Sequence, residues 1–331
     1  MNIYLTFDYE LYFGTTGTAA NCILQPTDML LEIAEKHNVK LVQFVDAGYL
    51  IKLDEYRSTF PSLEIDYQLI ISQLEKLWKD GHDIQLHIHP HWEDCSYSEV
   101  GWKMNVSRYM LNNWNDQQIE SIVYRYKKKL EEITGPNQIY AFRAGGWCIQ
   151  PFNRLKSALY SNEIRLDTSV YSNGHYSSKE YDYDFRNAPI KSKWKFNDDP
   201  LIEDSNGLFT ELPICSIYNS PLFYWKLFLL GRLNPYNHKP LGDGKPVATP
   251  GQRKKLLTSF THNTVSVDGY NAALLNRAFR QQQKANKEEM VIIGHPKSLT
   301  RFGLSALEKF IIKHKSTEAF TTFRAQKKSF L

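Results

Sequence analysis

The 331-residue sequence has few of the features that mark several large classes of protein. Its four cysteines are widely separated and never stand in a C-x-x-C spacing, which argues against a disulfide framework and a zinc knuckle. Lysine and arginine outnumber aspartate and glutamate by only 40 to 36, too small an excess to indicate nucleic-acid binding. We therefore expect neither a disulfide-stabilised scaffold nor a nucleic-acid partner.

Long apolar runs are also missing. The most apolar stretch, residues 221–230, is too short to cross a bilayer. The chain begins with a strand-like segment, without basic residues followed by an apolar run, so we expect no signal peptide and a soluble, cytoplasmic protein. The aromatic cluster from Phe223 to Phe228, beside Lys226 and Arg232, could meet a membrane or a lipid carrier. The alternative is a core element with a loop edge.

The sequence does contain alternating strand-like and helix-like segments. Short apolar runs predict strands, and apolar residues three or four positions apart predict helices. The predicted strands are residues 3–7, 40–45, 83–87, 138–142, a short strand through 166, 208–213, 290–293 and 319–323. The predicted helices are one that follows Pro26-Thr27 and runs to about residue 37, and three over about 66–79, 116–133 and 151–160. This order predicts one α/β domain over residues 1–331, with a largely parallel sheet or barrel. Residues 171–251 break the rhythm and are expected to form a long loop insertion.

Four of the ten histidines fall within ten residues, at His82, His87, His89 and His91. Neutral imidazole is the commonest metal ligand, so this cluster predicts a metal site; the alternative is a polar loop rich in histidine. His87 and His91, four residues apart, would share one face of a helical turn or a tight loop and are the predicted ligands. His89 would point elsewhere and is the second choice. His82 lies at the opposite end of the strand and is predicted to be structural.

Two acids, Asp8 and Glu10, follow the first predicted strand. Residues two apart in a strand share a face, so both carboxylates could face one site. One could bind a divalent metal, for which we expect Zn²⁺, while the other takes a proton from a water molecule. The alternative is a pair of surface acids at a strand end. Arg143, Asp167 and His295 also follow apolar runs, and active sites of parallel α/β folds lie at the carboxyl ends of strands.

Five segments, in this order, resemble the motifs of the NodB-homology polysaccharide deacetylases, carbohydrate esterase family four: residues 6–10, 84–91, 142–147, 166–169 and 293–296. The sequence departs from the family pattern twice. Tyr9 separates two acids that the family places side by side, and Ile88 replaces the usual serine or threonine after the first histidine. The resemblance implies a distorted (β/α) barrel of about seven parallel strands. It also implies metal-dependent hydrolysis of an N-acetyl group.

The chemistry of amide hydrolysis then suggests roles for these residues. Glu10, His87 and His91 are the predicted metal ligands, and the metal would polarise the acyl oxygen and lower the pKa of water. Asp8 is the predicted general base for that water.

The remaining roles concern the leaving group and the substrate. His295 would protonate the departing amine, and Asp167 would orient His295. Arg143 would pair with the general base and keep it ionised. The backbone N–H of Tyr9 would bind the oxyanion. The resemblance places Trp147 at the wall of the substrate pocket.

Together these features predict a metal-dependent N-deacetylase for an amino sugar, an intracellular precursor of a surface polysaccharide. Two alternatives remain. One is a hydrolase of a non-sugar amide or a cyclic imide on the same fold. The other is a non-catalytic carbohydrate-binding relative in which Glu10 does not place the metal correctly.

Overall fold

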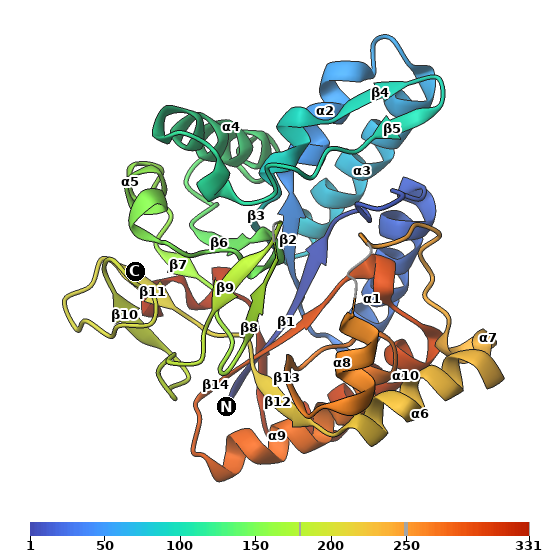
Figure 1. The fold of residues 1–331 in the computed structure, drawn as a ribbon, viewed down its shortest axis with the longest axis vertical. Helices are drawn as coiled ribbons and strands as arrows, with labels where there is room; N and C mark the ends of the chain where they lie inside the picture. Colours follow the sequence, from blue (N-terminus) through green and yellow to red (C-terminus); the bar gives the residue numbers. More distant parts are fainter. Residues whose placement is uncertain (179, 248–250, 331) are drawn as a thin grey trace. The chain divides into compact units, whose positions relative to one another are not determined.

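The computed structural model in Figure 1 describes residues 1–178, 180–247 and 251–330. Contacts divide the chain into two compact units, each assembled from segments that are distant in sequence. The first unit comprises residues 1–39 and 214–320, and the second comprises residues 40–213 and 321–331. The sequence predicts one catalytic domain over residues 1–331. That the two units form one such domain stays a prediction.

The first unit is built on two parallel strands, β1 (Asn2–Tyr9) and β14 (Glu289–Gly294). Two other segments run parallel to β14 through single bridges, Ile214 to Val291 and Ser266 to Ile293. The carboxyl ends of parallel strands meet at one edge of a sheet. The residues that follow β1, β14 and Ser266 are therefore brought to the same end of this unit.

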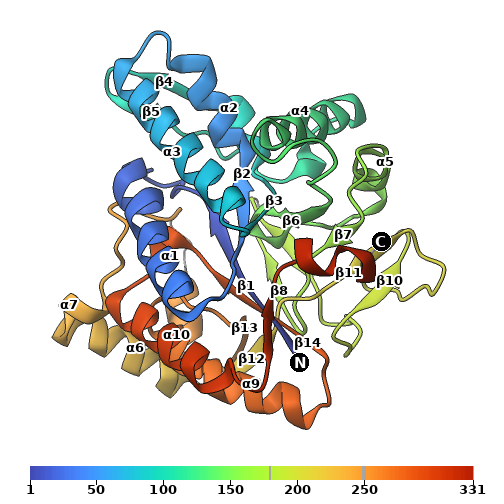
Figure 2. The same cartoon turned by 180° about the vertical axis from the view of Figure 1, so that it is seen from behind.

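Helices and short strands complete the first unit. Helix α1 begins at Gln25 with a proline in its first turn and ends at His37. It is followed by Asn38, a left-handed residue with φ of 52°, which is common after a helix. Helices α1 and α10 pack together and are best seen in Figure 2. The elements are the π-helical turn η1 (Ala20–Leu24), α1 (Gln25–His37), β12 (Ser216–Asn219), α6 (Pro221–Leu233), α7 (Pro235–His238), α8 (Gln252–Thr258), β13 (Thr261–Thr264), η5 (Gly269–Leu274), α9 (Leu275–Lys284), η6 (Pro296–Ser298) and α10 (Arg301–His314), with β15 (Ala319–Thr321) at the boundary between the units.

The second unit holds five parallel strands, and an antiparallel strand pairs with the last of them. In sheet order they are β2 (Val42–Asp46), β3 (Asp83–Ile88), β6 (Ala141–Ala144), β7 (Leu166–Asp167), β11 (Phe209–Glu211) and antiparallel β10 (Trp194–Phe196). Every residue of β2 and β3 is buried, as expected for strands covered on both faces. The register places His87 between Asp46 and Arg143 on the neighbouring strands.

Helices α2, α3 and α4 pack against β3 in this unit (Figure 1). Helix α4 begins with a capping box, in which Asn115 and Gln118 each accept a hydrogen bond from the other's backbone N–H. The remaining elements are α2 (Ala47–Tyr56), α3 (Pro61–Lys79), η2 (Pro90–Asp94), β4 (Ser96–Ser98), β5 (Gly101–Lys103), η3 (Leu111–Asn113), α4 (Asp116–Thr134), η4 (Gly145–Trp147), α5 (Asn153–Ser161), β8 (His175–Ser177), β9 (Asp182–Asp184) and η7 (Arg324–Ser329).

The α/β fold class predicted from the sequence is confirmed. The two units contain two and five parallel strands, the number expected for the distorted barrel. The predicted insertion, residues 171–251, contains more regular structure than expected, including two strands of the second unit's sheet and the 13-residue helix α6. Residues 179 and 248–250 of that insertion lie outside the described residues. None of the described helices is long and apolar enough to cross a membrane.

His82 has the structural role that the sequence suggests. It lies between α3 and β3, its side chain is buried, and its Nδ1 accepts a hydrogen bond of 3.0 Å from the backbone N–H of Leu41. A ring nitrogen that accepts this bond carries no proton. Burial, assisted by the positive charge of Lys40, lowers the pKa of His82 to about 4.

This pKa predicts a loss of stability in acid. In the unfolded chain His82 takes up a proton below about pH 6.5, whereas in the folded protein it stays neutral down to about pH 4. The stabilisation is therefore complete above about pH 6.5 and declines as the pH falls towards 4. As the pH falls from 6.5 to 4, the unchanged protein should lose about 3 kcal/mol more of its free energy of unfolding than His82→Asn, which lacks the titrating ring. Urea denaturation at several pH values measures this difference, and equal pH dependence of the two proteins would contradict it.

Candidate metal-binding and catalytic residues

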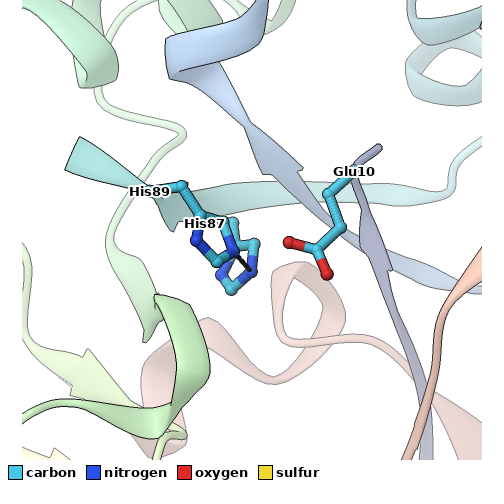
Figure 3. A group of neighbouring side chains, drawn as sticks. All are labelled: Glu10, His87 and His89. Atoms are coloured by element: carbon cyan, nitrogen blue, oxygen red, sulfur yellow. Dashed lines mark hydrogen bonds between the residues drawn. The ribbon is translucent and has the colours of Figure 1, made fainter. Parts of the chain in front are cut away.

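Two imidazoles converge at the carboxyl end of β3 in the second unit. The Nε2 atoms of His87 and His89 lie 3.0 Å apart, and a dashed line marks this contact in Figure 3. The backbone is still extended at His89, with φ of −112° and ψ of 89°, and residues two apart in an extended chain point to the same side. The expectation that His89 points away from His87 is therefore wrong. The helical turn begins only at Pro90.

A hydrogen bond fixes the tautomer of the His87 ring in the form that can bind a metal ion. Its Nδ1 lies 2.9 Å from the carbonyl oxygen of Arg143, which can only accept, so Nδ1 carries the proton and Nε2 keeps a lone pair. Two nitrogen ligands of one tetrahedral ion, each about 2.0 Å from it, lie about 3.3 Å apart. The separation of the two Nε2 atoms is close to this value. The donor atoms of the pair thus fit a shared metal ion.

Gly145, which follows β6, makes room for the second imidazole. A Cβ atom built on Gly145 would lie 2.5 Å from Nδ1 of His89, so any side chain there would displace the ring. The next two residues, Gly146 and Trp147, have left-handed φ values of 59° and 60°. This conformation is uncommon for a bulky residue, and such strain gathers at functional sites. The indole of Trp147 is half-buried and contacts the rings of Tyr171 and Tyr183 edge-on.

His91, the other predicted ligand, lies in the turn η2. Its ring stacks on that of Tyr109, with centroids 5.1 Å apart and planes 11° from parallel. The centroid of the His89 ring is 5.5 Å away. A metal-binding role for His91 stays a prediction, but the imidazole placed against His87 is that of His89.

A second cluster lies in the first unit, where β1 and β14 end. Nε2 of His295 lies 3.5 Å from Oδ2 of Asp8 and 3.9 Å from Oε1 of Glu10. Both carboxylates are buried, with exposed fractions of 3% for Asp8 and 5% for Glu10. The two acids face one imidazole, as their spacing in the strand predicts.

Asp268 holds His295 in place. Its two carboxylate oxygens accept hydrogen bonds from the backbone N–H and from Nδ1 of His295, at 2.8 and 2.7 Å. Both Nδ1 and the backbone N–H of His295 are held by Asp268, and the orienting role that the sequence suggests for Asp167 stays a prediction. Since Ser266 pairs with Ile293, the segment that carries Asp268 runs beside β14 and delivers the carboxylate to the strand's end.

The charge state of His295 follows from its surroundings. Burial lowers its pKa, but the nearby carboxylates, Asp268 foremost, outweigh this effect and raise the pKa to about 9. The imidazole is therefore protonated at neutral pH. It can give up a proton from Nε2, because Nδ1 is held by Asp268.

Lys297 is a member of this cluster that the sequence did not reveal. Its ammonium group donates to Oε1 of Glu10 at 2.8 Å and to the carbonyl oxygen of Leu11 at 2.6 Å. The side chain is buried, and a buried lysine is seldom found without a carboxylate partner. The ion pair fixes one of the two carboxylate oxygens of Glu10. The sequence neighbours of Lys297, Pro296 and Ser298, give no sign of this contact.

Arg143 and Asp167 belong to a buried polar network in the second unit. Nε of Arg143 donates to the carbonyl oxygen of Thr168 at 3.1 Å, and Ser169 donates its hydroxyl to Asp167 at 2.7 Å. Glu211 pairs with Asp167 in register on the neighbouring strand. Burial and the charge of Asp167 raise the pKa of Glu211 well above its usual range. Of these two neighbouring carboxyl groups, we therefore assign the protonated form to Glu211. The proposed pairing of Arg143 with Asp8 stays a prediction.

Tyr9 separates the two acids in the sequence. Its side chain is buried, with an exposed fraction of 2%, and burial raises the pKa of its hydroxyl well above the usual value. The predicted contribution of its backbone N–H to an oxyanion site remains a prediction.

A cavity of about 420 Å³ adjoins Asp268 in the first unit. It lies against the inner side of α6 at Leu227 and Phe228, and Arg232 and Arg253 also line it. The cavity is therefore lined by apolar and cationic side chains and lies beside Asp268, the residue that holds His295.

No protein-family model and no curated protein matches the sequence. Among solved structures, a protein from Mycobacterium smegmatis assigned as a polysaccharide deacetylase is similar, with a TM-score of 0.54 at 15% identity, over 99% of this chain and 89% of that one. A polysaccharide deacetylase from Bacillus cereus gives 0.43 at 12% identity, over 97% and 90%. A 4-alpha-glucanotransferase from Thermococcus litoralis gives 0.49 at 12% identity, over 100% of this chain and 40% of that one.

Identities this low show a likeness of fold alone. The conclusion rests on the Mycobacterium smegmatis protein, which has the highest TM-score of the three. This chain shares the fold of that protein over nearly its whole length.

Proposed function

We propose that the protein is a metal-dependent hydrolase of the NodB-homology polysaccharide deacetylase family, which removes an N-acetyl group from an amino sugar. The observation that carries this proposal is the convergence of His87 and His89, with a tautomer of His87 that leaves Nε2 available. A polar loop that is merely rich in histidine does not require this arrangement. The five ordered sequence motifs and the shared fold point in the same direction.

In this proposal Glu10 joins His87 and His89 as the third metal ligand. Figure 3 draws the side chains of these three residues, each of which is buried. One carboxylate and two imidazoles form a donor set that suits Zn²⁺. When bound, such an ion acts as a Lewis acid that polarises the acyl oxygen of the substrate. This ligand set replaces His91 of the sequence prediction with His89.

The chain's own residues supply the proton transfers. Asp8 takes a proton from the water molecule whose oxygen adds to the acyl carbon. His295, protonated at neutral pH, gives its Nε2 proton to the nitrogen as the carbon–nitrogen bond breaks, which releases acetate and the free amine. Asp268 keeps the ring of His295 aimed throughout.

The predicted substrate is an N-acetylated sugar, and Trp147 would form a wall of its pocket. The half-buried indole of Trp147 would offer an aromatic face to the apolar face of a sugar ring. That the sugar is an intracellular precursor of a surface polysaccharide, as the sequence suggested, remains part of the proposal.

The test is release of acetate. The metal-stripped protein, with and without added Zn²⁺, is incubated with chitooligosaccharides, with UDP-N-acetylglucosamine and with a cyclic imide; Asp8→Asn serves as the inactive control. We expect acetate and free amine in equal amounts from an acetylated sugar, only after Zn²⁺ is restored. Hydrolysis of the cyclic imide alone would instead favour a hydrolase of non-sugar amides or cyclic imides. Binding of the sugar without metal or turnover would favour a non-catalytic carbohydrate-binding protein.

A further inference from the structure

Helix α6 displays an apolar stripe to solvent. The stripe consists of four residues, whose exposed fractions are 77% for Leu222, 57% for Trp225, 55% for Leu229 and 73% for Leu233. Their spacing of three, four and four residues confines them to one face of the helix, within about 80° of arc. Tyr236, 72% exposed, follows directly in α7. Isolated surface leucines are ordinary, but a continuous apolar stripe marks an interaction surface.

The opposite side anchors α6 to the first unit. Tyr224 is buried and its hydroxyl lies 2.9 Å from Oγ1 of Thr261 on β13. On the exposed face, Nε1 of Trp225, a residue of the stripe, donates to the carbonyl oxygen of Leu257 on α8, at 3.1 Å. The helix is therefore held on its inner side through Tyr224 and beside α8 through Trp225, and Figure 1 shows α6 next to α8.

The segment of the chain that carries the stripe is strongly basic. Residues 221–258 contain a single acid, Asp243, against seven basic residues: Lys226, Arg232, Lys239, Lys245, Arg253, Lys254 and Lys255. Asp243 accepts hydrogen bonds from Thr18 and Asn21, far from the stripe in sequence. In the described part of the chain, none of the seven cations forms a salt bridge. The positive charge of this segment is thus not offset by salt bridges within the described residues.

We propose that the exposed face of α6 docks on an anionic lipid surface. Leucines and a tryptophan on one face of a helix enter the boundary between lipid headgroups and acyl chains, and lysines and arginines beside them attract anionic headgroups. The excess of cations favours this partner over a second copy of the chain, which would bring like charges together. The inner side of α6 lines the cavity that reaches Asp268, so docking would set that cavity beside the headgroups.

Vesicle flotation tests the proposal with the full chain. Vesicles of phosphatidylcholine are compared with vesicles that also contain phosphatidylglycerol, and the double variant L222D/L229D is compared with Leu69→Asp. Leu69 is a matched control, because it is a half-exposed leucine on α3 in the second unit. We expect binding to the anionic vesicles about tenfold tighter than to the neutral ones, lost in the double variant and kept in Leu69→Asp.

Three outcomes would overturn the proposal. The first is absence of binding by the unchanged protein, or equal binding to both kinds of vesicle, and neither depends on how a variant folds. The second is equal loss of binding in L222D/L229D and Leu69→Asp. The third is a dimer that L222D/L229D dissociates, in a protein that ignores vesicles, since the stripe would then be a contact between copies of the chain.

Discussion

Replacing either His87 or His89 with alanine is expected to remove the metal from the purified protein, whereas His91→Ala should retain it. The reason is that the Nε2 atoms of His87 and His89 converge to 3.0 Å, while the ring of His91 is stacked on Tyr109. Metal content, measured by mass spectrometry after dialysis, should fall from about one ion per chain to less than about a tenth in the first two variants. The loss of one nitrogen ligand leaves too few protein donors to hold the ion.

His175→Ala is the matched control for these measurements, because His175 is exposed on β8 and belongs to neither cluster. It should keep the metal. The opposite pattern, with metal kept in His89→Ala and lost in His91→Ala, would restore the ligand pair suggested by the sequence. Full metal content in all three variants would remove the histidine cluster from the metal site altogether.

The second large effect is expected for Asp268→Asn. Asparagine has the same size, but it replaces one of the two accepting oxygens with an NH₂ donor, so the hydrogen bonds from the backbone N–H and from Nδ1 of His295 cannot both be kept. His295 loses one of the two hydrogen bonds that hold its backbone and its ring. It also loses the negative charge of Asp268, which favours the protonated form of the imidazole. We expect kcat to fall by roughly 10²–10⁴-fold, with KM for the acetylated sugar and the metal content unchanged.

Asp167→Asn separates this role from a general effect of removing a buried carboxylate. Asp167 is bound to Ser169 and lies in register with Glu211, so its replacement should lower stability more than kcat. Thermal unfolding and initial rates, measured on both variants, give the comparison. If Asp167→Asn lost more kcat than Asp268→Asn while remaining as stable, the sequence-based assignment of Asp167 would be preferred.

The strands that carry the site could be predicted from the sequence because their signal is local. Fully buried strands appear as short apolar runs, and β1, β3 and β14 each end in polar residues that are easily recognised. Helix α2 and most elements within residues 171–251 were not predicted. Their sequences are short or carry many turn-forming residues, and tertiary packing rather than periodicity determines them.

The predicted arrangement of the histidines was wrong where it depends on backbone geometry. The interpretation that paired His87 with His91 assumed a turn directly after the strand. The chain instead remains extended through His89, and Gly145 leaves the space that its ring occupies. A spacing of four residues and a spacing of two are equally visible in the sequence. Only the backbone conformation decides which of them brings the rings together.

The sequence by itself determined the α/β fold class and the set of polar side chains at the ends of the strands, because both follow from the period of each segment. Tertiary structure alone decided which partners those side chains meet. Asp268 reaches His295 through a bridge between Ser266 and Ile293, and Lys297 reaches Glu10 across a separation of 287 residues. These contacts join segments that are distant in the chain, and no local pattern encodes them.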